Sequence, residues 1–114
     1  MEALKRFLEK LRSSGEVTWP AISLENAGFR TRGRVVLWSQ INRIAAFKRD
    51  MLTIDDIWFQ IDTADEPIMV CEEQPGFKEW QVALSQQFPT VYGWQEKIVQ
   101  PPFAENFTVL YSRT

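Results

Sequence analysis

The chain has no histidine and a single cysteine among its 114 residues. Without an imidazole there can be no Ser-His-Asp or Cys-His nucleophilic system and none of the usual histidine-ligated metal sites. One cysteine cannot form a disulfide within the chain, which fits a reducing, cytoplasmic compartment. These absences favour a binding protein over an enzyme, and we predict no catalytic residue, no metal ion and no cofactor.

Long apolar runs are also missing. A membrane-spanning helix needs about 20 consecutive apolar residues, and charged residues interrupt every hydrophobic run here well before that. Residues 1–12 mix charged and apolar side chains, unlike the continuous apolar core of a secretory signal. A net charge of −2 gives no electrostatic reason to expect nucleic acid as a partner. We therefore predict neither integral membrane association nor nucleic-acid binding.

The charges that are present are unevenly divided. Residues 1–50 hold ten Lys or Arg against five Asp or Glu, whereas residues 51–114 hold three against ten. One interpretation is that the fold interleaves the two halves, so that the contrast cancels. The other is a polarised surface that pairs with a protein partner or with a second copy of the chain, as a homodimer.

Apolar residues recur at helical spacing in two places, residues 2–12 and residues 77–88, the second ending at Pro89. Between them, short β-branched and aromatic runs separated by turn residues predict about five strands, mainly antiparallel. Alternating residues after Phe107 predict a terminal strand or an extended aromatic tail. Helix, strands, helix and tail are the order typical of an α+β fold, and the length suits a single domain over residues 1–114.

Three arginines alternate in the sequence. If the segment is one extended strand, Arg30, Arg32 and Arg34 place their guanidinium groups on one face. Such a stripe could accept phosphates or carboxylates bidentately. The alternative is an edge strand that charge protects from aggregation, with Gly33 at a bend.

A second candidate site is the charged segment Lys48, Arg49 and Asp50, which we predict to connect two antiparallel strands. Loops carry binding residues while strands hold them in place. This corner, followed by Asp55, is therefore either a contact site or a solvated turn.

Carboxylates form a third candidate. If the strands pair as expected, acidic residues at their ends converge and could bind Mg²⁺ or Ca²⁺ or perform acid–base chemistry. Their spacing matches no known metal-binding loop, and paired acids at strand ends are usually solvated or matched to cations. The residues are Asp50, Asp55, Asp56, Glu72 and Glu73.

The remaining candidates are a thiol and three aromatic side chains. Cys71 follows an apolar run and precedes two acidic residues, which predicts an inert strand cysteine rather than a reactive one. Trp19, Trp94 and Phe103 lie next to Pro or Gly. Each of them either closes an end of the core or belongs to a recognition surface.

The segment from Trp38 to Phe77 resembles a family of short, uncharacterised bacterial proteins. It carries a W-x-x-I-x-x-I-x-A-F-K-R-D core, then T-x-D, and then a strand ending in E-E and P-G-F. The tail, with P-P-F and L-Y-S-R, fits the same family, so that the resemblance covers about two-thirds of the chain. The family implies no activity. More loosely, strands that end in a helix are similar to bacterial pleckstrin-homology-like domains, although fold alone does not imply function.

Protein–protein contact is the function that these observations favour, and neutralisation of a toxin is one form it could take. One alternative is a metal-dependent enzyme built on the carboxylates. Another is an anion-binding or phospholipid-binding module built on the arginine stripe.

Overall fold

The computed structural model describes residues 19–50, 55–99 and 107–113, which form two antiparallel sheets and two α-helices. The predicted helix over residues 2–12 lies outside this part of the chain. The three-stranded sheet has the order β1 (Ser23–Glu25), β2 (Gly28–Thr31) and β3 (Arg34–Leu37). The four-stranded sheet has the order β6 (Ile68–Cys71), β5 (Asp55–Asp62), β4 (Arg43–Asp50) and β7 (Thr108–Ser112).

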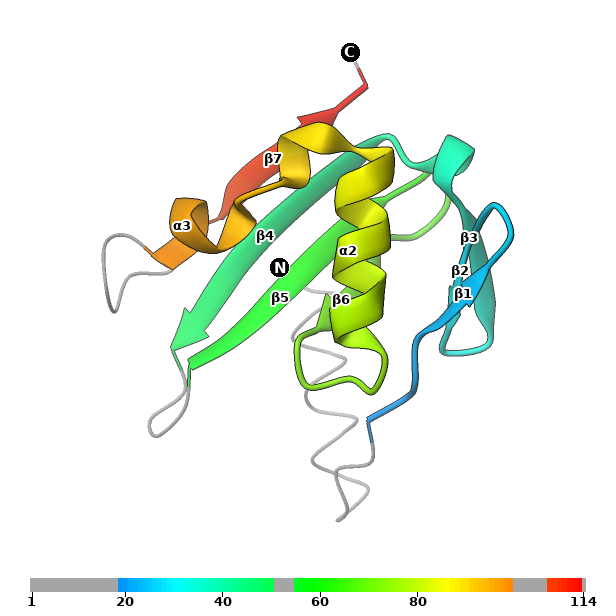
Figure 1. The fold of residues 1–114 in the computed structure, drawn as a ribbon, viewed down its shortest axis with the longest axis horizontal. Helices are drawn as coiled ribbons and strands as arrows, with labels where there is room; N and C mark the ends of the chain where they lie inside the picture. Colours follow the sequence, from blue (N-terminus) through cyan, green and yellow to red (C-terminus); the bar gives the residue numbers. More distant parts are fainter. Residues whose placement is uncertain (1–18, 51–54, 100–106, 114) are drawn as a thin grey trace.

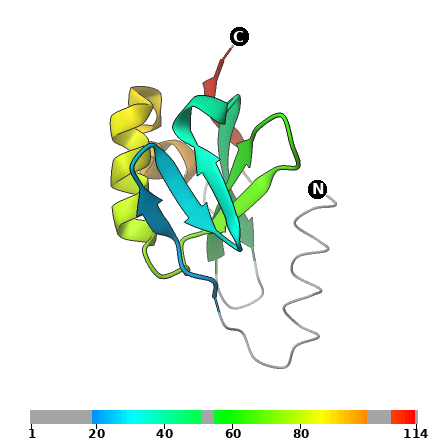
Figure 2. The ribbon, with the colours of Figure 1, turned by 90° about the vertical axis from the view of Figure 1, so that its right-hand side faces the viewer.

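Helices α2 (Phe77–Gln87) and α3 (Trp94–Val99) cover one face of the four-stranded sheet (Figure 1). Seen from the side of the three-stranded sheet, α2 lies along the β1 edge (Figure 2). Two 3-10 turns complete the path, η1 (Trp38–Gln40) between β3 and β4, and η2 (Pro89–Val91) between α2 and α3. The predicted α+β class with antiparallel pairing is confirmed, but the described residues form seven strands rather than about five.

Helix α2 forms where its apolar spacing predicts it. Phe77, Trp80 and Leu84 are buried at positions i, i+3 and i+7 of one face. The Trp80 ring packs 5.3 Å from Phe59 on β5 and 5.5 Å from Phe29 on β2. Because these rings belong to different sheets, α2 joins both sheets in one core.

The four-stranded sheet is buried on both faces. Strand β5 sends Phe59 and Ile61 toward α2, while Trp58, one position out of phase, joins Phe47, Met69 and Cys71 in a second cluster on the opposite face. Trp19 packs on Trp58 with ring centroids 6.0 Å apart. Trp94 is 4 % exposed and packs 5.0 Å from Phe59. Both tryptophans thus close the core, whereas Phe103 lies outside the described residues.

The β2–β3 turn is held by side chains as well as by its backbone. Arg32 and Gly33 both have positive φ, 55° and 71°, as a two-residue type I′ turn requires. Glycine adopts this conformation freely, but arginine does so at a cost. The Arg32 side chain offsets that cost, since its Nε donates to the Met69 carbonyl at 3.2 Å and its Nη2 donates to Gln74 Oε1 at 3.1 Å.

Gln74 connects this turn to the edge of β6. Its Oε1 also accepts from the Cys71 N–H at 2.8 Å, while Nε2 donates to the Pro20 carbonyl at 2.8 Å and to Thr31 Oγ1 at 3.1 Å. Gln74 is only 2 % exposed, and both amide atoms have two partners. Together Arg32 and Gln74 occupy the outward-facing backbone groups of β6, which a neighbouring strand would otherwise fill.

The first prediction concerns Gln74. Gln74→Met keeps the length of the side chain but leaves the Cys71 N–H and the Pro20 carbonyl without their partners. Since a buried unsatisfied group costs about 1–3 kcal/mol, the free energy of unfolding should fall by about 2–4 kcal/mol in a urea titration. Gln87→Met on the exposed side of α2 is the control, and equal stability of the two variants would contradict the role given to Gln74.

The second prediction concerns Trp80. Trp80→Ala should lower the free energy of unfolding by about 3–5 kcal/mol, as aromatic truncation in a packed core does. Val82→Ala, two residues further along on the exposed side of the same helix, should cost less than about 1 kcal/mol. A loss below about 1 kcal/mol for Trp80→Ala would mean that α2 does not pack on the core through this ring.

Candidate binding surface

The three arginines do not share a strand face, so the predicted stripe is wrong. The hairpin turn falls between Arg30 on β2 and Arg34 on β3, with Arg32 inside the turn. Arg30 pairs with Glu25 at 3.0 Å on the outer face of the small sheet. Arg34 donates to the Glu66 carbonyl and to Thr63 Oγ1 in the β5–β6 connection. The anion-binding or phospholipid-binding alternative therefore loses its geometric basis.

The Arg32 side chain is partly buried and hydrogen-bonded within the fold, so it has a structural role. Desolvation by burial lowers its pKa from the ordinary value to about 10, and the neighbouring Cys71 opposes that shift. The guanidinium therefore remains charged at neutral pH. Its hydrogen bonds to Met69 and Gln74 use that charge to link the hairpin to β6.

The Lys48, Arg49 and Asp50 segment is not a connection between strands. Strand β4 continues to Asp50 and pairs Lys48 with Ile57, Arg49 with Asp56 and Asp50 with Asp55. The prediction of a corner at these positions is wrong, because β4 stays paired with β5 beyond its last apolar residue, Phe47, as far as Asp50. Residues 51–54, between the two strands in sequence, lie outside the described residues. Lys48 is itself 7 % exposed and so cannot be part of a solvated turn.

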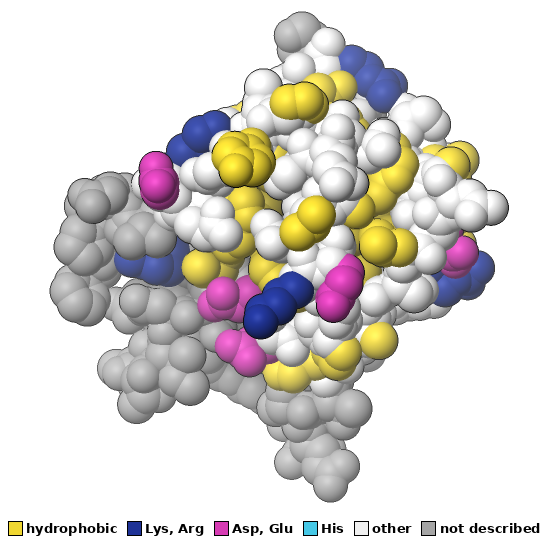
Figure 3. All heavy atoms as spheres, in the orientation of Figure 1, with side chains coloured by type: hydrophobic (Ala, Val, Ile, Leu, Met, Phe, Trp, Pro, Cys, Tyr) yellow, Lys and Arg dark blue, Asp and Glu magenta, His cyan; other side chains and the backbone are white. Residues whose placement is uncertain are grey.

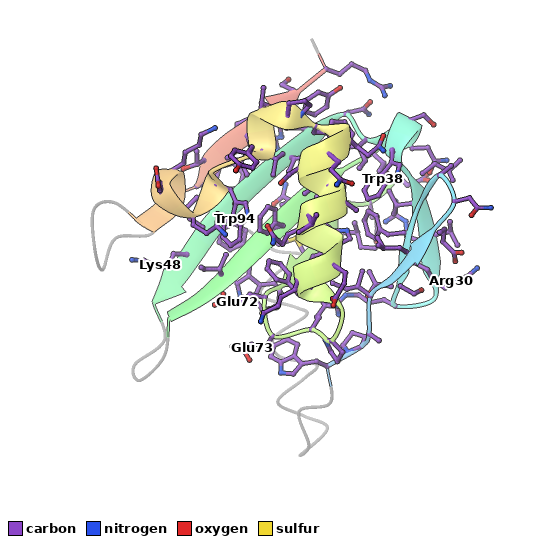
Figure 4. All side chains as sticks on the ribbon, in the orientation of Figure 1. Arg30, Trp38, Lys48, Glu72, Glu73 and Trp94 are labelled. Carbon is purple, nitrogen blue, oxygen red and sulfur yellow. The ribbon has the colours of Figure 1, made fainter. Side chains whose placement is uncertain are left out.

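The structure does not bring the predicted sites together. Figure 4 shows Arg30 and Lys48 on opposite sides of the molecule, with Glu72 and Glu73 near the lower end of α2. Glu72 Oε1 accepts from the Ile57 N–H at 3.3 Å, and Glu73 is exposed. The side chains of Arg49, Asp50, Asp55 and Asp56 lie outside the description. Among the side chains that are described, no group of three or more Cys, Asp or Glu is arranged to hold a metal ion.

Two adjoining grooves run along the exposed side of α2. One, of about 500 Å³, separates α2 from the corner between η2 and α3, and the other, of about 430 Å³, separates α2 from β1. Val82 and Gln86 line both grooves, so the two form one continuous surface across the helix. We call this surface the α2 face.

Exposed apolar side chains mark the α2 face. Tyr92 is 80 % exposed, Val82 50 % and Leu24 47 %. Figure 3 shows apolar side chains among uncharged polar ones there, with charged groups toward the lower end of α2 and beside α3. The lining residues that carry charge are Lys78 and Glu79 in one groove and Glu96 in the other.

One glutamine in the first groove is held in a set orientation. The indole Nε1 of Trp94 donates to Gln81 Oε1 at 3.0 Å. An indole nitrogen can only donate, so the atom that faces it must be the amide oxygen. The Gln81 NH₂ group is thereby left available for a ligand, and its orientation is fixed from within the core, because Trp94 is buried against Phe59.

The predictions from sequence do not include this surface, because they contain no helix at Trp94–Val99. Trp94 and Ile98 are both buried and lie at i and i+4, a spacing that indicates one helical face. The sequence predicts only an extended tail after the helix that ends at Pro89, and this prediction is wrong for Trp94–Val99. Apolar periodicity in α2 marks the face that packs on the core and gives no signal for the exposed face.

Among the described residues no helix is both long enough and apolar enough to cross a bilayer.

The third prediction concerns Cys71, which the structure places on β6 with no exposed surface. Its thiol should react with a thiol reagent such as dithionitrobenzoate much more slowly in the native protein than in urea, because the reagent reaches it only after opening of the fold. Absorbance of the released chromophore measures both rates. Equal rates in the two conditions would show that the cysteine is accessible.

Comparison with known proteins provides no relative from which to infer a role. No family model, curated protein or solved structure matches the chain significantly. The resemblance of Trp38 to Phe77 to a family of short bacterial proteins, and the looser one to pleckstrin-homology-like domains, remain predictions. What the α2 face can bind must therefore be inferred from its own side chains.

Proposed function

We propose that this chain is a protein-binding domain that contacts its partner through the α2 face. The observation that carries the proposal is the continuity of the two grooves, which meet at Val82 and Gln86. Leu24, Val82 and Tyr92 are distributed across them as exposed anchors. Large apolar side chains that gather on a surface typically mark an interaction site.

The chemistry of these anchors suits a protein partner. Tyrosine is enriched among the residues that dominate binding energy, because it buries a large ring at low entropic cost and keeps a hydroxyl for hydrogen bonding. Tyr92 extends from the short connection between η2 and α3. The polar residues around it are mainly uncharged, and this matches the depletion of charge at the centre of protein interfaces.

Other exposed apolar residues give weaker support for binding. Val35 and Leu37 lie on the outer face of β3, at 39 % and 38 % exposure, and line neither groove of the α2 face. Phe107 is engaged with its own sheet, since its ring stacks on Phe47 at 5.9 Å. The α2 face combines exposed anchors with neighbouring hollows.

The fourth prediction tests this surface in cells. A benzophenone amino acid in place of Tyr92 should cross-link one defined protein in the native host, identified by mass spectrometry. Adding Val82→Asp should remove that product by placing a charge at the centre of the contact. The variant should nevertheless lose no more than about 1 kcal/mol of folding stability, since Val82 is half exposed.

The matched control places the same probe at Ala64, an exposed residue in the connection between β5 and β6. The proposal fails if both probes give the same products, or if Val82→Asp leaves the Tyr92 product unchanged. Thermal melting of each variant separates lost binding from lost folding.

A further inference from the structure

We infer that the groove between α2 and α3 binds an extended peptide segment of the partner that has no acidic residue and one Lys or Arg, through hydrogen bonds from glutamine side chains. The inference rests on the proposed function and names the class of ligand that this groove takes. Gln81, Gln86 and Gln95 all line the groove, and Glu96 is the only charged residue that does so among those described. A glutamine amide carries one acceptor and two donors in a plane, the complement of a peptide group.

Gln81 is the anchor of this arrangement. Its oxygen is occupied by the Trp94 N–H, so its NH₂ group has a fixed direction and no acceptor among the described residues. Holding the donor in place before binding reduces the entropy lost on association. A backbone carbonyl of an extended segment satisfies this donor without bringing a charge into the groove.

The charge pattern selects against other ligands. Phosphate or carboxylate groups would meet Glu96 with no Lys or Arg lining the same groove to compensate. A ligand with a single cation at one end would instead pair with Glu96. The segment that fits therefore has no acidic residue, an apolar residue against Val82 and Tyr92, and one Lys or Arg beside Glu96.

The continuity of the two grooves agrees with an extended chain. The second groove continues past Val82 toward Leu24 and Ala83, which offer it apolar walls. A peptide that crosses α2 would place side chains alternately into the two hollows, as strands do. The exposed Val82 and Tyr92 side chains would flank its backbone.

The test selects phage-displayed random linear peptides on the folded chain and measures the recovered peptides by fluorescence anisotropy. Recovered sequences should lack Asp and Glu and carry a terminal Lys or Arg. Gln81→Glu keeps an oxygen for the Trp94 N–H but removes the NH₂ donor. This variant should weaken binding about tenfold, the effect of one lost hydrogen bond and added repulsion, with an unchanged melting temperature.

A charge reversal tests the polarity of the site. Glu96→Lys should weaken the cationic peptide about tenfold and abolish the advantage that it has over a neutral version of the same peptide. Asp65→Lys makes the same charge change at an exposed position outside the groove. It should leave binding within about twofold, because charges farther apart than a Debye length are screened.

Three outcomes overturn the inference. One is that the recovered peptides bind Gln81→Glu and Glu96→Lys as well as they bind the unmodified chain. Another is that oligomers of N-acetylglucosamine, which also carry amide groups, bind in a Gln81-dependent way while no peptide does. The third is a cross-link from Tyr92 to a defined protein together with no groove-dependent peptide, which would show that the partner docks a folded surface. In that case the proposed function stands without the extended segment, whereas an absent cross-link contradicts the proposed function itself.

Discussion

The architecture depends on one buried polar connection, the one between the β2–β3 turn and the edge of β6. Strand β6 ends its sheet, and its outward-facing backbone groups are buried rather than solvated. Buried backbone groups without partners would destabilise the fold. Gln74 and Arg32 supply those partners from outside the sheet, at Cys71 and at Met69. The three-stranded sheet is thereby attached to the four-stranded one without a continuous ladder of strands.

That attachment determines where α2 can lie. With the two sheets joined at the turn, Trp80 packs between their apolar faces, against Phe29 on one sheet and Phe59 on the other. The helix begins close to the same connection, where Gly76 approaches the Ile22 carbonyl so closely that any Cβ would clash with it. Burying one face of α2 leaves its opposite face on the surface, between β1 and α3. The α2 face is thus a consequence of how the core is closed.

The same core also organises the binding residues we assign. Trp94 packs on Phe59 with its ring and directs its N–H to Gln81, so a buried aromatic side chain orients a surface amide. The arginines of the predicted stripe have a structural role instead. Arg32 and Arg34 link the hairpin to β6 and to the β5–β6 connection, and Arg43 pairs with Asp62 at 2.7 Å across β4 and β5. These arginines hold strands together, and the surface best suited to binding is nearly neutral.

Local pattern alone determined the fold class and the helix at 77–88, because the spacing of Phe77, Trp80 and Leu84 reports one buried face whatever they pack against. It also identified Cys71 as a residue of a buried strand. Local pattern gave the wrong placement for Arg30, Arg32 and Arg34, because alternating residues in sequence can belong to one strand or to the two strands of a hairpin. Only the pairing of β2 with β3 places Arg32 in the turn. Only the tertiary structure could assign the α2 face, because Leu24, Val82 and Tyr92 are far apart in sequence and become neighbours through packing of β1, α2 and α3. Apolar periodicity indicates which side of an element is buried, whereas a binding surface depends on which exposed sides are brought next to one another.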